Sequence, residues 1–331
     1  MEAAPEDLPL DVRCLTSLGD CCPDPRLTRM QVVFEDAHVL VVNKAPHMVV
    51  HPSAGHQGGT LVNAVLHHCG LPAMRVAAGT TPRSALLPSD DPDADDEEDD
   101  PDGDDDAALA PAWTPSSTDA PLLRPGIVHR LDKGTSGLLV IAKDAVSHAG
   151  LCSQFAARSV TRKYQALHMG MLAPPLGGLP QGRVEAPIGR DASNRLRMAV
   201  VWAPGAKGVR PAASRYQLVD TLAGGGACHV HWRLETGRTH QVRVHAKHIG
   251  APLLGDPLYG GTASATAAAL VRAGNGKAQA QAFTDSLPAD RPCLHAAELG
   301  FTHPVTGEEM LFEAPPPADF QAVLKALTAL R

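Results

Sequence analysis

The sequence predicts an α+β domain with a mixed, mainly antiparallel sheet, flanking helices and a long insertion. The first observation is the continuous apolar run at residues 137–142, which is typical of a strand buried on both faces. The second is a series of later segments in which polar and apolar residues alternate, as in antiparallel strands covered on one side. The third is helical spacing of apolar residues over 320–330, which predicts an amphipathic C-terminal helix.

The elements before the apolar run begin near residue 31. Residues 1–30 carry no sustained periodicity and are expected to form an N-terminal tail. Two short strands are expected at 32–34 and 38–42. Thr60 is a suitable cap for a helix that ends near His68. Together these elements start a single domain that runs to the end of the chain at residue 331.

A polar segment at about 75–123 separates these elements from the apolar run. It is rich in Pro, Asp, Ser, Thr and Ala, and residues 89–107 hold 13 acidic and no basic residues. Such a segment buries too little apolar surface to offset the entropy of ordering, so it is expected to be a disordered insertion. Outside residues 89–107, 29 basic residues face 23 acidic ones, although the whole chain has a net charge of −7. The body of the protein therefore suits a polyanionic partner.

The elements after the apolar run alternate between helix and strand patterns. Helices are expected at 147–158 and 239–249. Residues 262–291 are rich in Ala and Gly and are expected to form a soft loop. The expected strands lie at 163–169, 195–201, 214–219 and 229–234.

Composition excludes several classes of protein. The apolar run at 137–142 is far shorter than the roughly 20 residues of a membrane-spanning helix, so no membrane span is expected. The seven cysteines are odd in number and form no C-x-x-C pair, which argues against a disulfide framework and a zinc site. A reducing compartment fits best, and cytosol, nucleus, plastid and mitochondrion all remain open.

Short motifs of other enzyme classes fail on inspection. The run from Gly134 through Ser136 begins like the G-x-S-x-G elbow of hydrolases, but its fifth position is Leu138 and the segment enters a strand instead of leaving one. A hydrolase built on Ser136 and a histidine stays as one rival hypothesis. The acidic insertion imitates half of a calcium loop but has Leu109 where a bidentate Glu is needed.

A set of charged residues lies where packing alone does not call for them. Arg130, Asp132 and Lys133 fall within four positions, directly before the apolar run. A single carboxylate at this place is more often a turn former or a cap. Three further segments add cations, a phenol and a turn-rich loop: Arg162-Lys163-Tyr164, the stretch ETGRTHQVRVH at 235–245, and LLGDPLYG at 253–260.

In this order, these segments resemble the RluA family of RNA pseudouridine synthases. The resemblance runs from about Val32 to the C-terminus, and within the family the chain is most similar to the large-ribosomal-subunit type. Its strongest parts are HRLD-x-x-T-S-G-L at 129–138, R-x-Y at 162–164 and ETGRTHQVRVH at 235–245. Many members also carry an N-terminal S4-like RNA-binding domain, which thirty residues cannot form.

The resemblance implies the pseudouridine synthase fold with a central catalytic cleft. It implies isomerisation of uridine to pseudouridine in structured RNA, either rRNA or tRNA, by a monomer that needs no cofactor and no metal. It assigns the catalytic carboxylate to Asp132, the aromatic that stacks on uracil to Tyr164, and the cation that holds the carboxylate to Arg243. A member of the fold that binds RNA without catalysis is the other rival. The implied RNA contacts are Arg130, His129, Lys163, Arg238 and Lys247.

Overall fold

The structure is a computed structural model, and two of the expected segments fall outside the part of the chain that it describes. The expected insertion at 75–123 lies outside it, as does most of the expected tail at 1–30. The described residues are 10–11, 29–51, 58–69, 126–172, 181–194, 196–203, 205–288 and 291–330.

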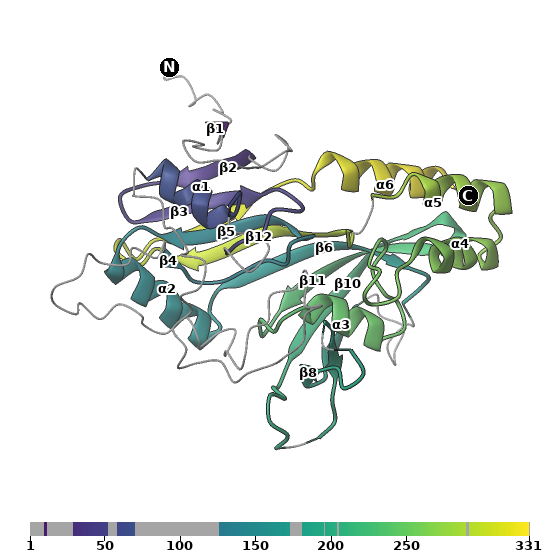
Figure 1. Cartoon of the computed structure of the whole chain (residues 1–331), viewed down its shortest axis with the longest axis horizontal. Coiled ribbons are helices and arrows are strands. Elements are labelled where there is room, and N and C mark those ends of the chain that lie inside the picture. Colours follow the sequence, from purple (N-terminus) through teal and green to yellow (C-terminus); the bar gives the residue numbers. More distant parts are fainter. Residues whose placement is uncertain are drawn as a thin grey trace.

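One large sheet runs through the described part of the molecule (Figure 1). Its order is β1-β2-β3-β5-β12-β6-β11-β10-β7, with β13 paired to β12 and β4 paired to β5. Only β5 and β12 pair in parallel in this sheet, so the predicted mixed, mainly antiparallel sheet is confirmed. The strands are β1 (Leu10–Asp11), β2 (Arg29–Glu35), β3 (Val39–Lys44), β4 (Gly126–Ile127), β5 (Ser136–Ala142), β6 (Thr161–Met169), β7 (Gln181–Glu185), β10 (Ala213–Leu222), β11 (Ala227–Leu234), β12 (Leu294–Thr302) and β13 (Glu309–Glu313).

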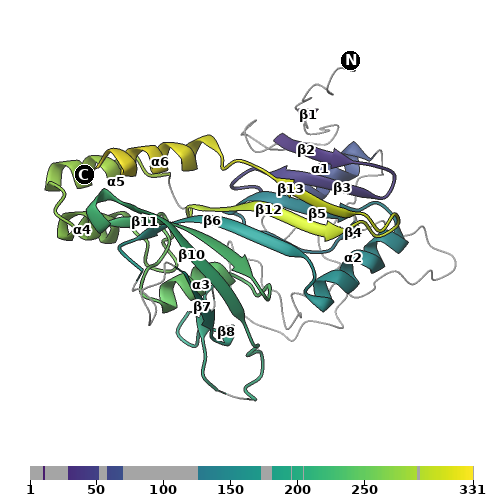
Figure 2. The ribbon, with the colours of Figure 1, turned by 180° about the vertical axis from the view of Figure 1, so that it is seen from behind.

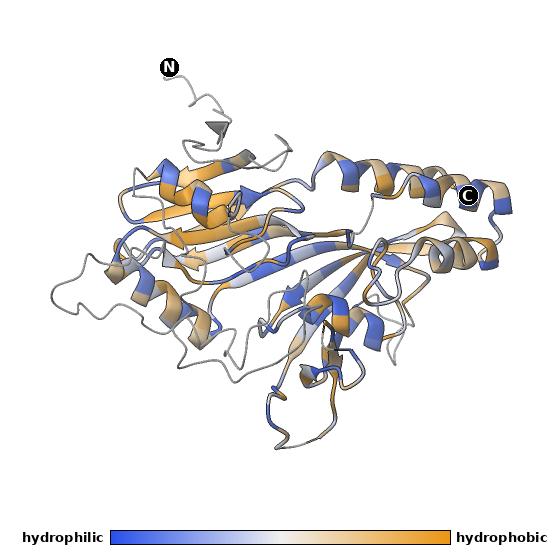
Figure 3. Ribbon diagram, viewed as in Figure 1, coloured by the Kyte–Doolittle hydropathy of each residue, from blue (hydrophilic) through white to orange (hydrophobic). Residues whose placement is uncertain are grey.

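The first half of the sheet follows from its sequence pattern. Every residue of β5 is buried, as the apolar run predicts, and β3 and β5 are the strongly hydrophobic strands in Figure 3. α1 (Leu61–His68) begins at the predicted cap, where Thr60 and Asn63 form a capping box. α2 (Ala145–Ala157) is capped by Asp144, whose carboxylate accepts from the Ser147 amide. In Figure 2, β12 lies beside β5 in the sheet, and β13 pairs with β12.

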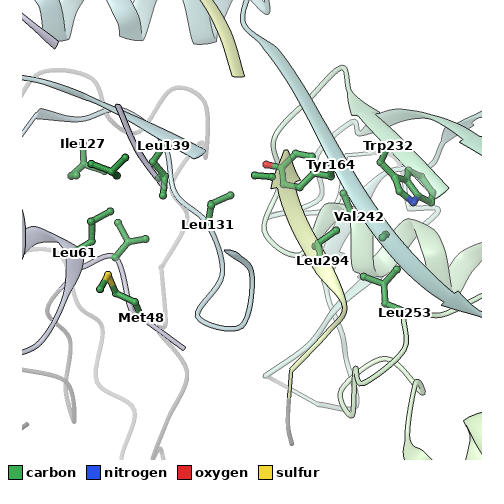
Figure 4. Close-up of a cluster of buried hydrophobic side chains, with 14 of the residues drawn as sticks. Met48, Leu61, Ile127, Leu131, Leu139, Tyr164, Trp232, Val242, Leu253 and Leu294 are labelled. Carbon is green, nitrogen blue, oxygen red and sulfur yellow. The ribbon is translucent and has the colours of Figure 1, made fainter. Parts of the chain in front are cut away.

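A hydrophobic cluster joins the two halves of the sheet (Figure 4). One group of side chains includes Leu61 and Leu139, and the other includes Trp232 and Val242. Leu131 lies between the two groups in Figure 4. The residue that follows it, Asp132, is therefore carried at the junction of the two halves.

The expected soft loop at 262–291 is wrong. The segment contains α4 (Ala263–Arg272) and α5 (Lys277–Asp285). Alanine is the strongest helix former, and Thr262 caps α4 by accepting from the Ala265 amide. Leu270 and Phe283 bury against α6 (Ala318–Ala329), which is the predicted C-terminal helix. Small residues weaken the apolar stripe of a helix without weakening the helix itself, so the sequence pattern of this segment resembles that of a loop.

The expected strand at 195–201 is shorter than predicted and belongs to a separate two-stranded sheet. It is β9 (Met198–Val200), paired with β8 (Ile188–Arg190). This hairpin projects from the main sheet in both ribbon views (Figures 1 and 2). The predicted helix at 239–249 is α3 (Gln241–His248). Among the described residues, no helix combines the length and the apolarity that a bilayer crossing requires.

Candidate active site

A pocket opens beside the loop before β5, the start of β6 and the start of α3. It encloses about 650 Å³, including the solvent at its mouth. All three residues expected to act in catalysis, Asp132, Tyr164 and Arg243, contribute to its wall. So does Thr135, whose hydroxyl is buried and makes no hydrogen bond within the described part of the chain. The wall thus combines a carboxylate, a phenol, a guanidinium and an unused hydroxyl.

Hydrogen bonds to its backbone carbonyls hold the loop that carries Asp132 in place. The Thr135 amide donates to the Asp132 carbonyl at 3.0 Å, which closes a tight turn. The buried Lys44 ammonium donates to the Lys133 carbonyl at 3.3 Å. The buried Arg291 guanidinium donates to the Gly134 carbonyl at 3.0 Å. These bonds fix the backbone on which the carboxylate stands.

The start of α3 is fixed by the side chain of Gln241. Its amide oxygen accepts from the Arg238 amide at 2.9 Å and from the Thr236 hydroxyl at 2.7 Å. Its amide nitrogen donates to the Ala213 carbonyl at 2.9 Å. Between these anchors, His240 adopts a left-handed backbone with φ 55°, which costs energy for a residue with a Cβ. This strained turn directs the first turn of α3 toward the loop before β5.

Arg243 is shared between two carboxylates. Its Nε and Nη2 donate to the two oxygens of Asp256 at 2.8 and 3.1 Å, in a bidentate pair. Its Nη1 donates to Asp132 Oδ2 at 3.2 Å. The guanidinium also lies 4.9 Å from the centre of the Tyr259 ring. Because Asp256 is fully buried, it orients Arg243 while leaving one nitrogen for Asp132.

Asp132 keeps its charge at this site. Burial alone would raise the pKa of the Asp132 carboxyl, but the positive charges of His240 in its protonated form, of Arg243 and of Arg130 outweigh it, and the net pKa lies below the usual value. Burial lowers the pKa of His240 to about 4, so this imidazole is neutral at pH 7. In neutral solution, Arg243 and Arg130 are therefore the cations that keep Asp132 ionised.

A chain of hydrogen bonds favours one tautomer of His240. The Met198 amide donates to the Tyr259 hydroxyl at 2.9 Å, so that oxygen is already an acceptor. The Tyr259 hydroxyl lies 2.8 Å from His240 Nδ1, to which it can donate its own hydrogen. A neutral imidazole that accepts at Nδ1 carries its hydrogen on Nε2. His240 Nε2 lies 3.9 Å from Asp132 Oδ2 on the pocket wall.

Tyr164 and Lys163 lie on opposite faces of β6. Half-buried and buried positions alternate at the start of this strand, and Tyr164 is only 7% exposed. In Figure 4 the Tyr164 hydroxyl points toward the side on which Leu131 lies. Lys163 is absent from the pocket wall and pairs with Glu298 at 3.5 Å. Lys163 therefore lies away from this pocket, because neighbouring strand residues face apart, and its expected contact with RNA stays a prediction.

The other expected RNA contacts divide into two kinds. Arg130 and Arg238 lie on the pocket wall, and Lys247 is exposed on the last turn of α3. His129 is buried, its Nε2 accepts from the Val140 amide at 3.0 Å, and burial lowers its pKa to about 3. His129 also contributes to the pocket wall, and its expected contact with RNA stays a prediction. Its ring supports β5 by stacking on Phe155 at 4.7 Å.

The hydrolase hypothesis does not fit the surroundings of Ser136. The Ser136 hydroxyl does lie 3.0 Å from His295 Nδ1. Both side chains are buried, Arg291 Nη2 also donates to the Ser136 oxygen at 2.9 Å, and His295 Nε2 contacts the Ala314 carbonyl. A substrate cannot reach this hydroxyl. Within the described ranges, no three His, Cys, Asp or Glu side chains are arranged to hold a metal ion.

Three residues of the site were not singled out from the sequence. Asp256 and Tyr259 lie in the LLGDPLYG stretch, and His240 lies in ETGRTHQVRVH. The sequence therefore pointed to both stretches, but not to these three residues within them. An aspartate and a tyrosine in a loop rich in turn residues are usually turn formers. Asp256 and Tyr259 both contact Arg243 because the chain folds back after α3. The spacing of residues in the sequence does not predict this contact.

Comparisons with known proteins agree with this fold. The family model "RNA pseudouridylate synthase" matches residues 38–248. The chain is 47% identical to RNA pseudouridine synthase 2, chloroplastic, of Arabidopsis thaliana, over 99% of this chain and 67% of that protein. It is 39% identical to ribosomal large subunit pseudouridine synthase D of Zymomonas mobilis, over 92% of this chain and 74% of that protein.

A solved structure supports the fold alone. Human RNA Pseudouridylate Synthase Domain Containing 4 matches with a TM-score of 0.54 and 21% identity, over 89% of this chain and 92% of that chain. The expected pseudouridine synthase fold is therefore confirmed. From the family match over residues 38–248 and the two curated relatives, the chain belongs to the RNA pseudouridylate synthase family, whose members are isomerases.

Proposed function

We propose that this chain isomerises uridine to pseudouridine in RNA, with Asp132 as the group that acts on the ribose. The observation that carries the proposal is the ion pair between Asp132 Oδ2 and the buried Arg243, which keeps a charged carboxylate on an open pocket. The chemistry needs such a group because the bond from C1′ to N1 breaks and C1′ then bonds to C5. No atom is gained or lost between substrate and product, since the C5 proton is replaced by a proton on N1.

Asp132 can act by two routes from the same position. In one, its carboxylate adds to C1′ as uracil leaves, and uracil later displaces it through C5. In the other, it removes the C2′ proton while the C1′–N1 bond breaks, which gives a glycal; uracil then bonds to C1′ through C5 and the proton returns to C2′. Both routes require the ionised carboxylate, and the lowered pKa of Asp132 supports both.

The other pocket residues fit supporting roles. Tyr164 is proposed to stack on the flipped uracil, and its hydroxyl to assist loss of the C5 proton. Arg130 is proposed to fill the space that the base leaves, which compensates part of an unstacking cost of a few kcal/mol. Arg238 and Lys247 are proposed to pair with phosphates beside the pocket.

His240 is proposed as a hydrogen-bond donor to the substrate. The Tyr259 hydroxyl, as a donor to Nδ1, favours a hydrogen on Nε2, which lies 3.9 Å from Asp132 Oδ2, too far for a hydrogen bond to it. A ribose hydroxyl or a uracil carbonyl beside Asp132 is the natural acceptor. The neutral imidazole suits this role because it donates without adding a second full charge.

Large-subunit rRNA is the substrate that we propose. The Zymomonas mobilis relative is named for the large ribosomal subunit, and the basic body of this chain suits a structured polyanion. The test incubates the purified protein with rRNA and tRNA transcripts that carry tritium at uridine C5. We expect tritium release from large-subunit rRNA. Binding of both RNAs without release from either would favour the inactive RNA-binding protein instead.

We propose the plastid as the compartment. Of the compartments that composition leaves open, the plastid is the one that the name of the Arabidopsis thaliana relative supports. A fluorescent fusion of the full chain, expressed in the source cells, tests it. Signal that overlaps chlorophyll fluorescence is expected, and a cytosolic or nuclear signal would reject the plastid.

A further inference from the structure

We propose that the projecting segment at residues 188–210 is an RNA-binding arm, in which Trp202 stacks on an unpaired base near the modified uridine. This inference rests on the proposed function, because it names the surface that receives the RNA beside the same pocket. The basic arm is defined here as residues 188–210, which contain β8, β9 and the loop that follows β9.

Trp202 is exposed where a tryptophan has no structural reason to be. Its side chain is 67% exposed, whereas Trp232 is fully buried in the core. The nearest aromatic partner is the His248 ring at 6.5 Å, at the end of α3, and that contact is tilted by 54°. Most of the indole therefore faces solvent, as expected for a platform on which a base stacks.

The charge of the basic arm favours RNA over an apolar partner. Its sequence holds five basic residues and a single acidic one, Asp191. Asp191 is already paired with Arg197 at 3.2 Å. Lys207 and Arg190 are exposed on the arm. An exposed indole among cations is the combination that binds single-stranded nucleic acid through stacking and phosphate contacts.

Two contacts connect the base of the arm to the pocket. Met198 of β9 donates its amide hydrogen to Tyr259, the partner of His240. At the other end, the Pro211 carbonyl next to the arm accepts from Arg238 Nε at 3.2 Å, and Arg238 lies on the pocket wall. The arm is thus a continuation of the site.

The helix α3 sets the span between the pocket and Trp202. Arg243 in its first turn faces Asp132, and His248 at its end faces Trp202. Eight helical residues rise about 12 Å, which corresponds to a few nucleotides of RNA. Lys247 lies on the same last turn, so a backbone that leaves the pocket along α3 meets a cation and then the indole.

Fluorescence and binding test the arm directly. Full-length protein is titrated with a short oligouridine and with an RNA duplex of equal length, with tryptophan emission as the readout. We expect quenching by the single strand, because a stacked base quenches indole, and little quenching by the duplex. In the Trp202→Phe variant this quenching should disappear while the dissociation constant changes less than about threefold, since phenylalanine still stacks.

Removal of the ring should weaken binding. We expect Trp202→Ala to raise the dissociation constant for oligouridine about tenfold, which equals about 1.4 kcal/mol. The matched control is Val146→Ala, because Val146 is 70% exposed on α2 and lies outside the arm. Lys207→Ala should reduce the slope of log affinity against log salt by about 0.7 if Lys207 pairs with one phosphate.

The outcomes separate this inference from the proposed function. Unchanged affinity and unchanged quenching in both Trp202 variants would overturn the arm, even if the wild-type protein makes pseudouridine. A shift of the Trp202→Ala binding curve, together with loss of quenching in Trp202→Phe, supports the arm even if no pseudouridine forms. A loss of affinity in Val146→Ala equal to that in Trp202→Ala would also overturn it.

Discussion

Arg243 sets the charge of Asp132 because the Asp256 carboxylate fixes the position of its guanidinium. Asp256 takes two nitrogens of the guanidinium and leaves Nη1 for the pocket carboxylate. These contacts raise the pKa of Arg243 despite the opposing effect of burial, so this cation cannot discharge at any working pH. The ion pair is therefore a fixed feature of the site.

Arg243→Ala should shift the pH dependence of turnover. Without the guanidinium, burial becomes the dominant influence on Asp132 and raises its pKa. Because the ionised form acts, the acid limb of the kcat–pH profile should move to higher pH, and kcat at neutral pH should fall about a hundredfold. The profile is measured by tritium release across the stable pH range.

Arg272→Ala is the control for this variant, because Arg272 is an exposed residue at the end of α4. It should leave the profile unchanged. An acid limb at the same pH in Arg243→Ala and wild type would mean that Arg243 does not set the charge of Asp132.

Two matched variants of His240 distinguish a role as a hydrogen-bond donor from a purely structural role. Glutamine can place an N–H near the position of Nε2, and alanine cannot, while both keep the same strained backbone at φ 55°. We expect His240→Ala to lower kcat about tenfold or more with little change in KM, and His240→Gln to recover most of it. Steady-state kinetics on rRNA transcripts provide the comparison. Equal losses in the two variants would reduce His240 to a structural role.

Sequence motifs predicted several residues that line the pocket, but Lys163 is not one of them. Asp132, Tyr164 and Arg243 each lie within a dense motif, and the structure brings all three to one pocket. Lys163 adjoins Tyr164 in the sequence but lies away from the pocket, because neighbours in a strand face different directions. Proximity along the chain is thus a poor guide to which side of a sheet a side chain occupies.

At the scale of elements, β5 and β12 make the only parallel pairing of the large described sheet, directly behind the catalytic loop. Gly137 pairs with Ala296 in this ladder and has φ 122°. A Cβ at Gly137 would lie 2.2 Å from the Ala296 carbonyl oxygen. This close approach lets β12 reach Ser136, whose hydroxyl contacts His295.

Gly137→Ala should lower both stability and turnover. The clash and the unfavourable backbone together should reduce the free energy of unfolding by more than about 2 kcal/mol, as measured by denaturant unfolding. Gly307→Ala separates the two causes, because Gly307 also has positive φ, 75°, but a Cβ there would meet no atom within 4 Å. It should cost about 1 kcal/mol. Similar losses at the two positions would argue against close packing behind the loop.

The strands and helices with strong periodicity were predictable, and the others were not. The buried run of β5 and the stripe of α6 depend on large apolar residues, which give a clear pattern. α4 and α5 consist largely of alanine and polar residues, so their helix propensity exceeds their amphipathic signal. β8 and β9 have only three residues each, too few for an alternation to be recognised.

At the scale of the whole molecule, opposite charges are separated along the chain. The acidic stretch at 89–107 lies outside the described residues, and the remaining chain carries an excess of basic residues. The basic arm and the pocket wall hold several of these cations. RNA affinity should therefore depend on the body of the protein and not on the acidic stretch.

Deletion of residues 84–117 tests this separation. The shortened chain should fold, with a free energy of unfolding within about 1 kcal/mol of wild type, because a polar segment contributes little buried surface. Its kcat on rRNA should be unchanged. Denaturant unfolding and tritium release measure the two quantities. An insoluble or inactive product would assign a structural role to the deleted segment.

The charge of Asp132 is the central claim, and Asp132→Asn tests it most directly. Asparagine keeps the shape of the side chain but cannot act as an anionic nucleophile or base. The measurement is single-turnover release of tritium from C5-labelled uridine in rRNA, with the RNA dissociation constant determined in parallel. We expect complete loss of release with RNA affinity close to wild type, whereas release at the wild-type rate would contradict the assignment of Asp132 and the mechanism built on it.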